Sequence, residues 1–211
     1  MRLLEGLTEK ISPVELLPFE SQAAHPGAST LQLASLLKQI LRATLEARKL
    51  VQGRSSDDLT KGIEPESWSV AECLDHLART TSAFLPAIST AIVAAPKLTS
   101  NRKLRTGTIA SLLIRRLEPP YRLRYKVLSQ LMPLENDFDA AWVAFENSQS
   151  RLSESVRSAA GLAIDQRKVP CPVCAHVTYN AYGAFRMLAA HQRRHLWQIQ
   201  QILGALDGRR A

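Results

Sequence analysis

The sequence predicts an all-α protein, a four-helix bundle with a long connection between the second and the third helix. Two observations support this prediction. Four long segments place their apolar residues at helical spacing, and no convincing pair of alternating strand segments is present. The stretches between those segments are rich in proline, glycine and charged residues, which is typical of connections. Long amphipathic helices joined by one long crossover are typical of a bundle.

We divide the chain into an irregular N-terminal arm, residues 1–29, and a bundle domain, residues 30–208. The arm contains three prolines and no sustained apolar period. The first helix is predicted from residue 30 to about residue 51, where leucines and an isoleucine recur at helical spacing and Gly53 follows as a stop signal. The polar stretch 54–66 is predicted to be a loop.

The second helix is predicted to start after the motif "WSVAEC". Ser69 stands three residues before Glu72, which is the spacing of a capping box. The apolar period continues to about Ala94, and Pro86 inside it is expected to kink the helix or to divide it in two. Residues 97–133 form the long connection, with a short helix expected over 108–117.

The third helix is predicted over residues 136–160 and the fourth over 179–206, ending at Gly208. The stretch between them is too rich in proline for a helix and is predicted to be a connection without a strand pair. At 211 residues the chain needs no more than one domain with a sizeable core.

The composition favours a globular protein of the cytoplasm. No apolar run approaches the roughly 20 residues that span a bilayer, and the N-terminus lacks the features of a signal peptide. Three cysteines are an odd count, which favours reduced thiols over a disulfide framework. The net charge of +8 raises the hypothesis of a nucleic-acid partner. Because the basic stretch 102–126 contains few aromatic residues, we favour a solvated connection over a nucleic-acid site.

The fourth helix places His191 and His195 on its apolar face. At about 100° per residue, His191 lies some 40° to one side of His195 and Ile199 some 40° to the other. Two imidazoles four residues apart can reach one ion. His76 is the histidine of the second helix, and its neighbours on that face are small. Three neutral imidazoles suit zinc, nickel or iron and leave coordination positions open, as catalytic sites do.

Three observations limit this hypothesis. His76 taken alone is more often a core residue than a ligand, so the pair in the fourth helix carries most of the argument. The zinc-protease motif H-E-x-x-H is absent, because Gln192 stands where its glutamate would be. Asp75 adjoins His76 but points about 100° away from it, so we expect it at the surface or behind the ligand.

Cys171 and Cys174 offer a rival metal site. With His191 and His195 they form C-x2-C-x16-H-x3-H, which is near a zinc-finger spacing but longer than the usual ~12 residues. Because the helix places its start far from His191, a finger is disfavoured. A redox C-x-x-C is disfavoured too, since the fold has no predicted strands. Two free thiols in a loop are the ordinary interpretation, and local zinc ligation with His176 stays open.

These residues, taken in order, resemble the DinB-like (YfiT-like) superfamily. The resemblance covers roughly residues 31–206 and rests on "WSVAECLDHL", on "HQRRHLWQI" and on the order of the four helices. It implies an up-down-down-up bundle in which His76, His191 and His195 bind a divalent metal. It also implies a homodimer. Family members of known chemistry include transferases and isomerases that use low-molecular-weight thiols, and hydrolysis is suggested for others.

We therefore expect a metal-dependent enzyme that acts on a small molecule. The metal would activate water for hydrolysis or a low-molecular-weight thiol for S-transfer. No general base and no binding residue for the thiol can be named from the sequence. The alternative is a non-enzymatic metal-binding or basic interaction module that engages nucleic acid or an acidic partner.

Overall fold

The fold was analysed in a computed structural model that describes residues 27–64, 66–119, 121 and 129–209. Four long helices dominate this part of the chain: α1 (Ala28–Val51), α3 (Val70–Val93), α5 (Phe138–Ser158) and α6 (Ala181–Gly208). The shorter elements are α2 (Ser56–Thr60), α4 (Thr108–Leu117), the 3-10 turns η2 (Ser129–Leu131) and η3 (Ile164–Gln166), and the strands β1 (Lys168–Cys171) and β2 (Cys174–Asn180). The all-α prediction is confirmed. The N-terminal arm lies almost entirely outside the described residues.

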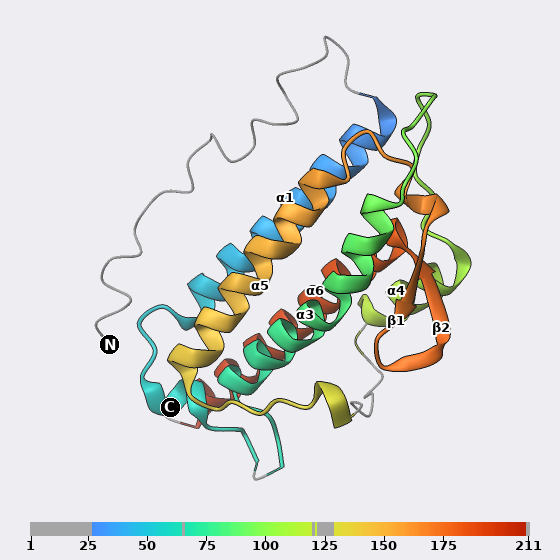
Figure 1. The fold of residues 1–211 in the computed structure, drawn as a ribbon. Coiled ribbons are helices and arrows are strands. Elements are labelled where there is room, and N and C mark those ends of the chain that lie inside the picture. Colours follow the sequence, from blue (N-terminus) through green and yellow to red (C-terminus); the bar gives the residue numbers. More distant parts are fainter. Residues whose placement is uncertain (1–26, 65, 120, 122–128, 210–211) are drawn as a thin grey trace.

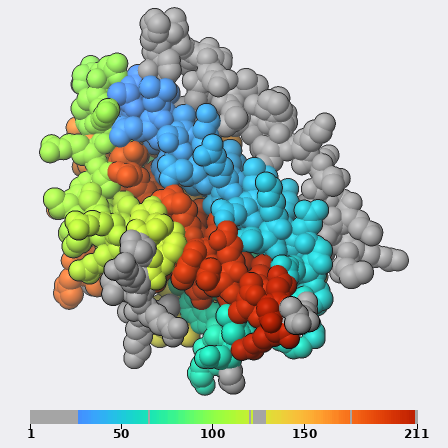
Figure 2. All heavy atoms as spheres, turned by 180° about the vertical axis from the view of Figure 1, so that it is seen from behind, coloured from blue at the N-terminus to red at the C-terminus, as the bar shows by residue number. Residues whose placement is uncertain are grey.

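The long helices lie side by side along one axis. Figure 1 shows α1 and α6 running in one direction and α3 and α5 in the other. Helix α3 packs against both α5 and α6, and α1 packs against the same two helices. Seen from behind, α1 and α6 form one continuous face, with the segment around α4 beside them (Figure 2). None of the described helices is long and apolar enough to cross a membrane.

Three of the long helices begin at residues whose side chains satisfy the free amides of the first turn. The predicted capping box is confirmed, because the Ser69 side chain accepts from the Glu72 amide and Glu72 accepts from the Ser69 amide. At the start of α5 the Asp137 side chain accepts from the Ala140 amide, and at the start of α6 the Asn180 side chain accepts from the Gly183 amide. Helix α3 continues through Pro86 as one element, so of the two predicted outcomes, a kink or a division, the division is wrong.

Two predicted loops contain regular structure. The polar stretch after α1 forms helix α2, whose cap Ser55 accepts from the Asp58 amide. The stretch before α6 forms an antiparallel hairpin of β1 and β2, so the absence of a strand pair was wrongly predicted. Pro170 concealed the strand because proline breaks regular structure in general. A two-stranded sheet has only edge strands, however, and edges tolerate proline.

The core falls into two groups of buried apolar residues along the bundle. One group, near the hairpin and α4, includes Phe84, Leu152 and Phe185. The other, at the opposite end, includes Leu74, Leu77 and Phe145, together with apolar residues from the last turns of α6. Gly183 at the start of α6 allows close packing, since a Cβ there would lie 2.3 Å from the Thr106 carbonyl oxygen. This contact fixes the position of the connection before α4 on α6.

Candidate metal centre

The structure brings His76, His191 and His195 together between α3 and α6. The Nε2 atom of His191 lies 3.2 Å from Nε2 of His76 and 3.1 Å from Nε2 of His195. His76 and His195 are buried, and His191 is partly exposed. In the described part of the chain, these three residues are the group of side chains able to hold a metal ion. They are the pair that helical spacing indicated in the fourth helix and the histidine of the second helix that the family resemblance adds.

The two distances from His191 suit nitrogens that share one ion, and the ligand atoms of all three residues lie within 4.8 Å of one another. A zinc–imidazole bond is about 2.0–2.1 Å long, so nitrogens 3.1–3.2 Å apart correspond to an angle of about 100° at the metal. That angle falls between the ideal octahedral and tetrahedral values. Imidazole ligands suit zinc, nickel and iron alike, so the ligand set does not select among them.

His76 is held in the tautomer that a metal ligand requires. Its Nδ1 donates to the carbonyl oxygen of Leu131 at 2.6 Å, because a carbonyl can only accept. The proton is therefore on Nδ1, and the lone pair of Nε2 points at the other two histidines. A hydrogen bond of this kind from the second ring nitrogen is usual for metal-binding histidines.

Asp75 holds the segment that carries this carbonyl. Its carboxylate is buried and accepts from the backbone amides of Leu134 at 2.8 Å and of Glu135 at 3.3 Å. The side chain indeed points away from the centre, as the helical geometry predicted, but it is not a surface residue. It fixes the chain directly after η2, and so it supports His76 through Leu131.

Trp68 covers one side of the centre. Its ring centroid lies 4.9 Å from that of His76 and 5.9 Å from that of His195. Helical periodicity does not predict this position of Trp68. Trp68 stands directly before Ser69, the cap of α3, and His76 lies two turns further along the same helix. This short separation is the sequence signal that could have placed Trp68 near His76.

The electrostatic environment keeps the three imidazoles neutral. Burial lowers the pKa of each ring, and for His191 the value falls to about 3. The neighbouring histidines lower the pKa values of His191 and His195 further, and so does the cation of Arg194. Neutral imidazoles have the free lone pair that metal binding requires. The Nε2 of His76 can only accept, and the single Nε2 of His191 is the neighbour of both other rings. Hydrogen bonds among the three rings therefore cannot satisfy all three Nε2 atoms.

Gln192 turns away from this chemistry. Its side chain is buried and its Nε2 donates to Oε1 of Gln149 on α5 at 2.7 Å. This hydrogen bond ties α6 to α5 inside the bundle. The residue at the position of the zinc-protease glutamate is therefore structural, which agrees with the exclusion of that mechanism.

The surface beside the centre carries aromatic and cationic groups. The guanidinium carbon of Arg194 lies 5.7 Å from the ring centroid of Tyr121, and that ring lies 4.8 Å from the ring of Trp197. His191, which neighbours these groups along α6, is the partly exposed ring of the three. Arg194 adds positive charge beside it.

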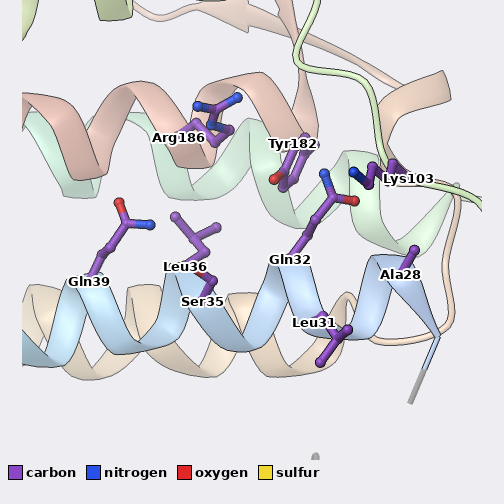
Figure 3. Close-up of a pocket in the computed structure, with 9 residues that line it drawn as sticks. All are labelled: Ala28, Leu31, Gln32, Ser35, Leu36, Gln39, Lys103, Tyr182 and Arg186. Carbon is purple, nitrogen blue, oxygen red and sulfur yellow. The ribbon is translucent and has the colours of Figure 1, made fainter. Parts of the chain in front are cut away.

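Two hollows lie outside the centre. One, of about 440 Å³, lies between α1 and the start of α6 (Figure 3). Its cations are Lys103 and Arg186, and its Gln32 is held by both backbone groups of Leu104. None of the three histidines lines this hollow. The second, of about 560 Å³, lies between α3 and α5, where Asp75 and Leu131 form part of the wall. It therefore borders the support of His76.

The two cysteines of the hairpin do not join the histidines. The metal-capable group contains neither Cys171 nor Cys174, although all the residues of the hypothetical finger are described. The zinc-finger alternative is therefore not supported. The cysteines lie instead at the turn of the hairpin, and local ligation with His176 is likewise absent from the metal-capable groups of the described residues.

A comparison with protein-family models identifies the family of the chain. The family model described as the DinB superfamily matches residues 39–199, which is more than half of the chain. The chain belongs to the DinB superfamily. The matched range of this DinB protein begins inside α1, ends inside α6 and includes all three histidines. Searches of curated proteins and of solved structures each found no match. The resemblance on which the sequence analysis relied is thus confirmed.

Proposed function

We propose that this DinB protein is a metal-dependent enzyme in which His76, His191 and His195 bind one divalent ion. The observation that supports it most strongly is the convergence of three neutral imidazoles, with His191 Nε2 at 3.1–3.2 Å from the other two. A divalent ion held there would lower the pKa of a water or thiol that binds to it and would so supply a nucleophile near neutral pH. The reaction is hydrolysis or S-transfer on a small molecule.

The chain's own residues prepare the site for this chemistry. The Leu131 carbonyl holds the proton of His76 on Nδ1, and Asp75 keeps that carbonyl in place. Trp68 excludes water from the covered side of the rings. Arg194 supplies a positive charge that favours an anionic nucleophile or substrate beside His191. No carboxylate or free histidine of the described residues stands out as a general base.

The basic stretch contributes to the fold, which favours the enzyme over the basic interaction module. Arg102 makes two hydrogen bonds to the carboxylate of Asp165, at 2.7 and 2.9 Å. Within the same stretch, Glu118 pairs with Arg193 of α6. Arg122, Arg124 and Lys126 lie outside the described residues. We propose a cytoplasmic enzyme with a small-molecule substrate that acts as a homodimer and does not bind nucleic acid.

The choice between water and thiol can be tested on cobalt-substituted protein. Glutathione is added to the wild type and to the His191→Ala variant, and the absorption spectrum is recorded. A new sulfur-to-cobalt charge-transfer band in the wild type alone supports S-transfer. Hydrolysis of a p-nitrophenyl ester by metal-loaded protein, without such a band, supports the water mechanism. Ester hydrolysis at the same rate by metal-free and metal-loaded protein, with no charge-transfer band on addition of glutathione, would contradict the proposal.

A further inference from the structure

The turn between β1 and β2 places two thiols opposite each other. Cys171 and Cys174 are direct partners in the antiparallel ladder and are separated only by Pro172 and Val173. All three cysteines of the chain are free thiols in the structure. We propose that this turn is a thiol–disulfide exchange site, at which Cys171 and Cys174 close into an intrachain disulfide on reaction with a low-molecular-weight disulfide.

The backbone geometry supports closure without rearrangement. The Cα atoms of directly opposed residues in an antiparallel pair lie about 4.5–5.5 Å apart. Disulfides join Cα atoms that are about 4.4–6.8 Å apart. Side chains of opposed residues also point to the same face of the ladder. The register shifts between Pro170 and Cys171, so the cysteine pair closes the turn beyond the regular part of the ladder.

The exposure of the three thiols sets the order of reaction. Cys174 is partly exposed, Cys171 is 9% exposed, and Cys73 is completely buried inside α3. Burial also raises the pKa of Cys73, which keeps it protonated and unreactive. A soluble disulfide therefore meets Cys174 first. Cys171 is the thiol that resolves the mixed disulfide.

Tyr179 is placed to assist Cys171. Its hydroxyl interacts with the Cys171 thiol by a hydrogen bond, and its ring lies 5.9 Å from that of Phe84 on α3. Burial, reinforced by the neighbouring thiols, raises the pKa of Tyr179, so the hydroxyl keeps its proton. A protonated hydroxyl can donate to a thiolate and stabilise it. Tyr179 thus acts on the resolving thiol as a positioning residue.

The exchange is balanced by the added disulfide alone. The Cys174 thiolate attacks one sulfur of a glutathione disulfide, forms a mixed disulfide and releases one glutathione thiolate. The Cys171 thiolate then attacks Sγ of Cys174, forms the intrachain bond and releases the second glutathione thiolate. The protons of the two cysteine thiols pass through solvent to the two glutathione molecules. The protein loses two electrons and two protons, and the glutathione disulfide gains them.

This reaction is independent of the metal proposed above. The hairpin contacts α3, α4, α6 and η3, and its cysteines are not part of the histidine group. A failure of the exchange therefore leaves the metal-dependent enzyme untouched, and the reverse is also true.

Full-length protein without a tag, reduced and freed of reductant, is incubated with glutathione disulfide, quenched with acid and analysed by intact mass and peptide mapping. The wild type is expected to lose two hydrogens and to give a peptide linked between Cys171 and Cys174. The Cys171→Ser variant stops at one glutathione on Cys174. The Cys174→Ser variant reacts roughly tenfold more slowly, because its remaining hairpin thiol is buried.

Tyr179→Phe separates a positioning role from a merely structural one. The first step, on Cys174, is expected to keep its rate, while closure slows by roughly threefold to tenfold as the thiolate loses its donor. The proposal is overturned if the wild type accumulates the same mixed disulfide as Cys171→Ser. It is equally overturned if neither hairpin thiol of the folded wild type reacts, or if Cys174→Ser reacts as fast as the wild type.

Discussion

The histidine centre and the cysteine turn differ in how the chain assembles them. His76 and His191 are 115 positions apart and meet only because α3 packs on α6. Cys171 and Cys174 meet through a two-residue turn. The centre therefore depends on the tertiary fold, and a bound metal would stabilise that fold in return, whereas the turn is a local structure. The metal-capable group thus needs a histidine from each of two helices, and the adjacent cysteines of the turn are not part of it.

The largest expected effect is the stabilisation of the whole fold by metal. Zinc at about 1,000 times its Kd is expected to add about 4 kcal/mol to the free energy of unfolding and to raise Tm by about 10 °C. Thermal unfolding of chelated and zinc-loaded protein measures this difference. His176→Ala, which removes an exposed histidine of the hairpin, should show the full shift. If zinc raised the Tm of His195→Ala as much as that of the wild type, the stabilisation would not arise from the histidine centre.

The next effect concerns the support of His76. Asp75→Ala releases the backbone amides of Leu134 and Glu135, which frees the Leu131 carbonyl to move. We expect metal affinity to fall by about 10- to 100-fold, as for other residues that hold a ligand in place. Competition with a chromogenic chelator measures it.

Asp165→Ala is the matched control for Asp75→Ala. Asp165 is also a buried carboxylate that accepts from a backbone amide, that of Arg105, but it lies in η3. This variant should be less stable yet bind metal with wild-type affinity. Equal losses of affinity in both variants would show that Asp75 acts only through general stability.

Acid is expected to destabilise the metal-free protein through the same three rings. Burial lowers their pKa values in the folded state below the unfolded value near 6.5, so below that pH the unfolded chain binds more protons. Stability is therefore fully present above about pH 6.5 and is lost as the pH falls. For His191, with a folded pKa of about 3, the loss between pH 7 and pH 5 is roughly 1–2 kcal/mol.

Urea unfolding of metal-free protein at several pH values checks the acid effect. In His191→Gln the dependence between pH 7 and pH 5 should be weaker, because one group that titrates only on unfolding has been removed. An unchanged pH dependence in this variant would mean that the acid sensitivity arises outside the centre.

The smallest expected effect is that of removing the hairpin thiols on metal binding. The double variant Cys171→Ser, Cys174→Ser should bind zinc within about 0.5 kcal/mol of the wild type, because distant, independent sites hardly couple. Calorimetric titration of the chelated proteins measures the affinity. A tenfold weaker zinc affinity in the double variant would indicate that the cysteines are metal ligands.

The centre was predictable because helical periodicity is a strong signal. The angle of about 40° between His191 and His195 placed both on the core face of α6, and the capping motif at Ser69 fixed the start of α3. Together these gave the long helices and the three histidines. Periodicity does not show how far one helix is shifted along another. The expectation that His76 on α3 lies beside His191 on α6 came from the family resemblance.

The supporting residues were not predictable, for physical reasons. Asp75 accepts from amides of a segment nearly 60 positions later in the chain, and no pattern in the sequence connects the two. The hairpin was hidden by Pro170 and Pro172, since only the edge position of β1 makes the first of them acceptable. The role of Trp68 follows from packing between helices, which a pattern along one helix does not contain.

The most direct test of the central claim is the metal content of protein purified without a histidine tag, measured by elemental analysis for the wild type, His76→Ala and His176→Ala. Each protein is also measured after incubation with zinc, nickel or iron and removal of the excess. The three-histidine centre predicts about one metal ion per chain in the wild type and in His176→Ala, and almost none in His76→Ala. Metal retained by His76→Ala at the wild-type level, or no metal in any of the three after incubation, would contradict it.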